Sequence, residues 1–183
     1  MSEKKWQTEK LDSGGRNALK RNAGVMMGSG LQALEAFYRA IAYAPKSQDQ
    51  EAQWFACLCM ECLWKPEDHP RVVRMEELLR QLYRNSETSD SIKRRVISLL
   101  DVPWSRDGYL LGKLSNFARM FRAKDGSVMP DFDALADDLA GWNHPDRYVQ
   151  RRWIRTICGT AQDDAADNNQ DNEDEEEDTE NAD

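Results

Sequence analysis

Two acidic pairs are the first candidates for chemistry in this 183-residue chain, Glu76-Glu77 and Asp137-Asp138. Paired carboxylates can share a proton or hold a metal ion when they converge on one point. Adjacent residues of a helix point about 100° apart, so neither pair can converge on a proton. We therefore interpret both pairs as solvated helix faces.

The three closely spaced cysteines are the second candidate, with the pattern Cys57-x-Cys59-x-x-Cys62. On a helix, Cys59 and Cys62 lie about 60° apart, whereas Cys57 lies nearly opposite Cys59. Only two thiols can face one ion, and neither His69 nor His144 is a local partner. We expect buried thiols that pack as small apolar side chains, with no metal site and no cofactor.

Motifs typical of enzymes are not found in the sequence. It has no glycine-rich phosphate loop, no Gly-x-Ser-x-Gly and no His-Glu-x-x-His. His144 lies near Asp146 in an Asn-His-Pro-Asp sequence, which more often forms a cap and bend than a general base. We expect a protein that is not an enzyme.

Basic side chains form clusters on four predicted helices. The clusters are Arg16, Lys20 and Arg21; Lys93, Arg94 and Arg95; Lys113, Arg119 and Arg122; and the stripe Arg147, Arg151 and Arg155 with Arg152 beside it. Such residues can neutralise phosphates, which gives a salt-dependent affinity that is largely independent of sequence. They could equally be solvated faces paired with Asp and Glu, and charge alone does not decide.

The charge is distributed unevenly along the chain. All 25 Lys and Arg lie between Lys4 and Arg155, while 12 of the 33 acidic residues lie from Asp163 onward. Residues 1–162 therefore carry a formal charge of +4 and the remainder −12, so the net charge of −8 hides a modestly basic body. The tail has nothing apolar to bury, and we expect it to be disordered.

Apolar residues recur at intervals of three and four, and strand signals are almost absent. This pattern predicts an all-α fold of about nine helices. The expected helices span 3–11, 13–23, 31–43, 48–64, 70–84, 90–100, 107–123, 130–142 and 147–158. Asp12 or Ser13 caps the second helix, and Pro70 fits the first turn of the fifth.

The polar run 85–91 is the best boundary within the body, although it could be only a loop between helices. It divides the chain into an N-terminal helical lobe, 1–86, a C-terminal helical lobe, 87–160, and the disordered acidic tail, 161–183. We therefore expect the body to be a bilobed helical bundle. Without a signal peptide or an apolar run of about 20 residues, we expect a cytoplasmic protein that does not bind membranes.

Several segments resemble the CasB family, the small subunits of type I-E CRISPR (Cascade) surveillance complexes. The similar segments are Leu11-Asp12-x-Gly14-x-Arg16-x-x-Leu19-Lys20-Arg21, Ala36-Phe37-Tyr38, Leu110-Leu111-x-Lys113-Leu114, Met129-Pro130-Asp131-Phe132 and Trp142-Asn143-His144-Pro145-Asp146-Arg147-x-Val149-Gln150-x-Arg152-Trp153. The last is the most specific. The likeness covers most of 3–158 and fades between about 50 and 84.

The resemblance implies a bilobed, non-catalytic subunit present as two copies in the complex. Its partners would be the other Cascade proteins, the CRISPR RNA and the target DNA strands. Its basic surface would support the guide–target duplex and the displaced strand, which stabilises the opened R-loop. The matching positions are Arg16, Lys20, Arg21, Arg39, Arg94, Arg95, Lys113, Arg119, Arg122, Arg151 and Arg152.

Two other classes of protein stay open: a helical adaptor that binds only protein, and an enzyme whose site the sequence does not reveal. The acidic tail departs from the family pattern. It could be a solubilising extension, or it could occupy the basic groove before assembly. In the second case, truncation after Thr160 raises the affinity for single strands at low salt.

Overall fold

The computed structural model describes residues 4–159. The predicted acidic tail, 161–183, lies outside the described residues. The elements are η1 (Thr8–Lys10), α1 (Ser13–Arg21), α2 (Leu31–Ala40), α3 (Gln48–Glu61), η2 (Pro66–Asp68), β1 (Arg71–Val73), α4 (Met75–Arg84), α5 (Asp90–Leu99), α6 (Tyr109–Lys124), β2 (Val128–Pro130), α7 (Phe132–Ala140) and α8 (Tyr148–Cys158). The predicted, mostly helical fold is confirmed.

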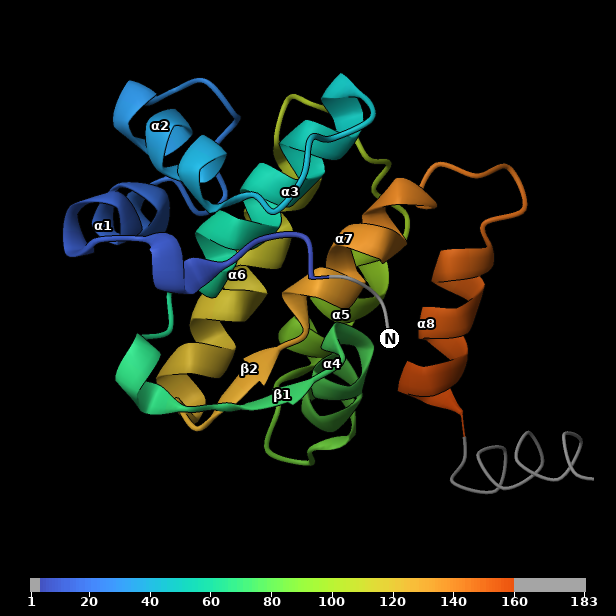
Figure 1. The fold of residues 1–183 in the computed structure, drawn as a ribbon. Helices are drawn as coiled ribbons and strands as arrows, with labels where there is room; N and C mark the ends of the chain where they lie inside the picture. Colours follow the sequence, from blue (N-terminus) through green and yellow to red (C-terminus); the bar gives the residue numbers. More distant parts are fainter. Residues whose placement is uncertain (1–3, 160–183) are drawn as a thin grey trace, which may run out of the picture.

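Helix α3 lies at the centre of the molecule, between α1 and α2 on one side and α7 on the other (Figure 1). Every residue of α3 from Ala52 to Met60 is buried, which is why its apolar residues are not restricted to one face. Ser47 caps the helix by accepting a hydrogen bond from Gln50 N, and Asp49 and Glu51 lie in its first turn. The helix expected over 48–64 is therefore the central helix of the fold.

The buried thiols also belong to this central helix. Cys57, Cys59 and Cys62 are all buried, as expected. Burial raises the pKa of all three thiols, that of Cys62 to about 12, so they stay protonated and pack as small apolar side chains.

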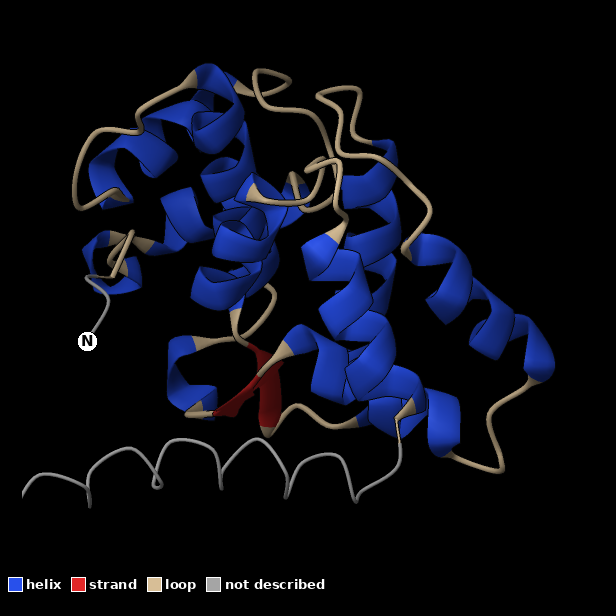
Figure 2. Ribbon diagram, turned by 90° about the vertical axis from the view of Figure 1, so that its right-hand side faces the viewer, coloured by secondary structure: helices blue, strands red, loops and turns tan. Residues whose placement is uncertain are grey.

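Two short strands interrupt the helical pattern, which the sequence did not predict. β1 pairs with β2 in parallel, with Arg71 opposite Val128 and Val73 opposite Pro130 (Figure 2). The prediction of a helix that starts at Pro70 is therefore wrong over its first turns. The residues after Pro70 are extended, and α4 begins at Met75.

The N-terminal segment is extended where a helix over 3–11 was expected. Lys5 and Gln7 exchange backbone hydrogen bonds with Ala42 and Ala40 at 2.9 Å, and only the 3-10 turn η1 is helical. Trp6 is fully buried, and its indole Nε1 donates to Glu61 Oε2 at 2.6 Å. Burial of this tryptophan against α3 therefore overrides the local helical pattern.

Segments from both sides of the expected boundary at 86/87 pack together. α3 packs against α7, α4 packs against α8, and β1 pairs with β2. The buried apolar side chains of the described residues form one cluster from Trp6 to Ile157. The division into lobes 1–86 and 87–160 stays a prediction.

The helices of the described residues are all too short or too polar to cross a membrane.

Candidate nucleic-acid interface

A groove between α1 and α6 joins two of the predicted basic clusters. Asn17, Lys20 and Arg21 from α1 line it together with Arg119 from α6. We call this the α1–α6 groove. The two helices are about 100 residues apart in the sequence, so only the fold brings these side chains together.

The loop after α1 holds the two walls of the groove in place. Arg119 Nη2 donates to the carbonyl oxygen of Ala23 at 3.1 Å, which ties α6 to the end of α1. Gly24 has a φ of +86°, and a Cβ at this position would lie 2.8 Å from the Cβ of Ser115. Only glycine fits this close approach, because Ser115 is buried against the loop.

The cations of the α1–α6 groove have no carboxylate partner among residues 4–159. Lys20 is exposed and makes no side-chain hydrogen bond or ion pair there. Arg21 donates only to the carbonyl oxygen of Asn17 at 3.3 Å, and Arg119 only to that of Ala23. The groove therefore carries positive charge that the body of the protein does not neutralise.

Arg16 of α1 and Arg39 of α2 have structural roles. The Arg16 guanidinium donates to the carbonyl oxygens of Thr8 and Trp64, at 3.2 and 3.4 Å. Arg39 forms ion pairs with Glu35 at 2.6 Å and Asp12 at 3.2 Å, which raise the pKa of its guanidinium. Its charge is therefore already compensated within the chain.

The other two predicted residues of α6 do not line the groove. Arg122 is half-buried and pairs with Asp68 of η2 at 3.0 Å. It thus contacts a different segment from Arg119, although the sequence placed the two on one face. Lys113 Nζ lies 4.9 Å from the ring centroid of Tyr109, a cation–π contact on the exposed side of α6.

Arg94, Arg95 and Arg151 are exposed on α5 and α8 and do not line the groove. Arg94 donates to the carbonyl oxygen of Asp90, and neither Arg95 nor Arg151 has a side-chain partner within the described part of the chain. Helix α8 lies on the opposite side of the molecule from α1 (Figure 1). Phosphate binding at these three positions stays a prediction.

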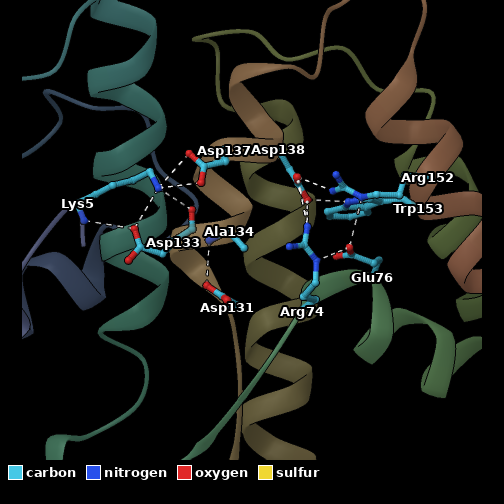
Figure 3. A network of polar contacts seen from close by, with 10 residues as sticks. All are labelled: Lys5, Arg74, Glu76, Asp131, Asp133, Ala134, Asp137, Asp138, Arg152 and Trp153. Carbon is cyan, nitrogen blue, oxygen red and sulfur yellow. Dashed lines mark hydrogen bonds and ion pairs between the residues drawn. The ribbon is translucent and has the colours of Figure 1, made fainter. Parts of the chain in front are cut away.

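Arg152 belongs to a polar network between α4, α7 and α8 (Figure 3). Arg152 and Arg74 both pair with Asp138, at 2.5 and 3.3 Å, and Arg74 also pairs with Glu76 at 2.7 Å. The indole of Trp153 donates to the same Asp138 carboxylate at 2.8 Å. Arg152 also pairs with Glu76 at 3.7 Å, so two carboxylates compensate its charge and make it a poor candidate for phosphate binding.

The network also corrects the interpretation of the acidic pairs. Glu76 and Asp138 are 3% and 5% exposed, so these two carboxylates are buried and not solvated. Their neighbours Glu77 and Asp137 are the members of each pair that face solvent. Asp137 pairs with the buried Lys5 at 3.0 Å, an ion pair that the sequence did not predict.

Arg147 does not belong to the predicted stripe on the last helix. It precedes α8 with a φ of +49°, and its guanidinium donates to the carbonyl oxygen of Leu100 and to Asp101. Asn17 is the groove residue that the sequence did not identify. Its position one turn before Lys20 and Arg21 could have indicated it, but only with the neighbouring helix known.

The fold and the groove define a small, mostly helical protein with uncompensated cations on one face. A family model described as CRISPR-associated protein Cse2 matches residues 15–156. The chain therefore belongs to the CRISPR-associated Cse2 family, which confirms the family resemblance predicted from the sequence.

Similar proteins cover most of the chain. The CRISPR-associated protein Cse2 of Thermus thermophilus is 26% identical over 156 residues, 85% of each chain. The crystal structure of CasB from Thermus thermophilus has a TM-score of 0.61 and 26% identity over 81% of this chain and 87% of that one. A chain of a CRISPR RNA-guided surveillance complex has the same fold, with a TM-score of 0.64 and 22% identity over 86% and 88% of the two chains.

Proposed function

We propose that this protein is a non-catalytic subunit of a CRISPR RNA-guided surveillance complex and binds nucleic acid by its phosphates. Its partners are the other proteins of the complex, the CRISPR RNA, the target DNA strands and a second copy of itself. Family membership and the fold shared with a chain of such a complex support the assembly.

The observation that carries the proposal is the uncompensated charge of the α1–α6 groove. Lys20, Arg21 and Arg119 line one groove and have no carboxylate partner in the described part of the chain. An anion with regularly spaced charges, such as a nucleic-acid backbone, fits this arrangement without reading bases. We therefore take Lys20, Arg21 and Arg119 as the centre of the proposed site. Arg16, Arg94, Arg95, Lys113 and Arg151 also have no carboxylate partner in the described part of the chain, and phosphate binding there stays a prediction.

A few phosphate contacts are enough for a useful effect in such a complex. The exchange of a DNA duplex for a guide–target heteroduplex is nearly balanced in free energy, so small added contacts tip it towards the opened state. The role requires no reaction centre in this chain. Stabilisation of the R-loop, through the heteroduplex or the displaced strand, is the function that best fits the groove.

The test is the target-DNA affinity of the complex assembled without this chain and again after the chain is added back. We expect the affinity to rise on addition, and the rise to shrink as salt increases, because phosphate contacts release counterions. If the affinity is the same with and without the chain, the phosphate-binding role is wrong and a protein-only adaptor replaces it.

A further inference from the structure

The exposed face of α6 extends beyond the groove. Tyr109, Lys113, Asn116 and Arg119 follow one another at intervals of four, three and three residues, so they fall within about a third of the helix circumference. None of the sixteen residues of α6 is acidic. Tyr109 lies ten residues before Arg119, about 15 Å along the helix axis.

Tyr109 differs from the other exposed tyrosines of the described residues. It is 62% exposed, and its ring makes a cation–π contact with the ammonium group of Lys113. Tyr38 donates its hydroxyl to Glu51 and packs on a phenylalanine ring, Tyr43 packs on Trp54, and Tyr148 packs on His144. Tyr109 has neither a contact with another aromatic ring nor a hydroxyl hydrogen bond among the described residues.

The surroundings of Tyr109 are apolar on one side and basic on the other. Met26 and Val25, in the glycine-containing loop after α1, are 46% and 40% exposed. A Cβ on Gly108 would lie 3.3 Å from Met26 Cγ, so Met26 packs against the residue that precedes Tyr109. An apolar, aromatic end therefore adjoins a cationic groove along one helix.

We propose that Tyr109 is a stacking platform for an unpaired base of a single strand whose phosphates lie in the α1–α6 groove. This inference rests on the proposed function and deepens it by assigning one side chain to contact the unpaired bases of a single strand. Stacking tolerates any base, because every base has a π face. Bases of an intact duplex already stack on one another, so the platform favours single strands over duplex.

The test uses the full chain, fluorescence anisotropy at low salt, and three probes: a thymidine oligonucleotide, an abasic oligonucleotide of the same length, and a blunt duplex. We expect Tyr109→Leu to weaken binding of the thymidine strand about fivefold or more. Binding of the abasic strand and of the duplex stays unchanged, because both use only the phosphates. Tyr109→Phe keeps the aromatic ring and binds like the wild type.

Two further variants separate the possible outcomes. Tyr148→Leu changes a comparably exposed tyrosine on α8 and is expected to have no effect. Lys20→Gln lowers the affinity for all three probes, because it removes a phosphate contact. If Lys20→Gln weakens binding while Tyr109→Leu does not, stacking is wrong and phosphate binding stands.

Three other outcomes also overturn stacking. The first is no measurable binding of the thymidine strand at low salt, which leaves the phosphate role to be decided by adding the chain back to the complex. The second is that neither variant weakens binding, which counts against the groove as well. The third is a Tyr109→Leu chain that binds the strand normally but no longer enters the complex, which would identify Tyr109 as a protein contact.

Discussion

Asp138 is the side chain on which three helices converge. Its carboxylate, only 5% exposed, accepts a hydrogen bond from the Trp153 indole and pairs with Arg74 and Arg152 (Figure 3). Removing this carboxylate leaves the buried indole without its acceptor and leaves Arg74 and Arg152 paired with Glu76 alone, which costs more than the ion pairs contribute when intact.

We expect Asp138→Ala to lower the free energy of unfolding by about 2–4 kcal/mol, the lower end reflecting solvent screening of the half-exposed arginines. Urea denaturation monitored by tryptophan fluorescence measures the change. Glu77→Ala is the matched control, because Glu77 is solvated and weakly paired, and it should cost about 0.5 kcal/mol or less. Equal losses in the two variants would show that the network does not stabilise the fold.

This network also shows what the sequence cannot predict about single residues. The helical period correctly indicates that adjacent acids point in different directions, but not which of them is buried. Which acid is buried depends on its partners from other elements. Trp153 lies on α8, and Arg74 directly precedes α4. The ion pairs of Arg152 could not be predicted either, because it lies beside the basic stripe of the last helix, which is typical of a solvated face.

At the scale of elements, the loop after α1 determines the shape of the groove. Gly24 and Gly28 both have positive φ, but a Cβ on Gly24 would meet Ser115, whereas one on Gly28 would meet nothing within 4 Å. Substitution by alanine strains the backbone at both positions, by about 1–2 kcal/mol. Only at Gly24 does it also push the loop away from α6.

We therefore expect Gly24→Ala to destabilise the protein more than Gly28→Ala and, unlike it, to weaken oligonucleotide binding. The binding loss follows because Ala23, whose carbonyl oxygen holds Arg119, precedes Gly24 directly. Thermal denaturation and anisotropy measure the two effects. Similar binding by both variants would mean that the loop does not position Arg119.

The helices were predictable where their signals are local. Asp12 caps α1 by accepting from Gly15 N at 2.6 Å, as the sequence indicates. β1 was not predictable, because its partner strand is more than 50 residues away and its three residues have no clear pattern of alternation. The extended N-terminal segment was not predictable, because tertiary contacts bury Trp6 and the local sequence does not show them.

At the scale of the whole molecule, ion pairing compensates the charge of several basic residues and leaves others without a carboxylate partner in the described part of the chain. The sequence correctly places basic clusters on α1 and α6, but it cannot show which cations already have partners. Arg39, Arg122 and Arg152 pair with carboxylates, whereas Lys20, Arg21 and Arg119 have no such partner among the described residues. The formal charge of +4 over residues 1–162 is therefore a poor guide to the site.

The most direct measurement compares Lys20→Gln with Lys65→Gln in the assembled complex. Both remove one lysine charge, but Lys20 lines the groove without a carboxylate partner in the described part of the chain, whereas Lys65 is exposed and pairs with Glu67. We expect Lys20→Gln to weaken target-DNA binding and to reduce the slope of log affinity against log salt by about 0.9, one phosphate contact. Lys65→Gln should leave both unchanged. Identical slopes for wild type and Lys20→Gln would contradict phosphate binding in the groove.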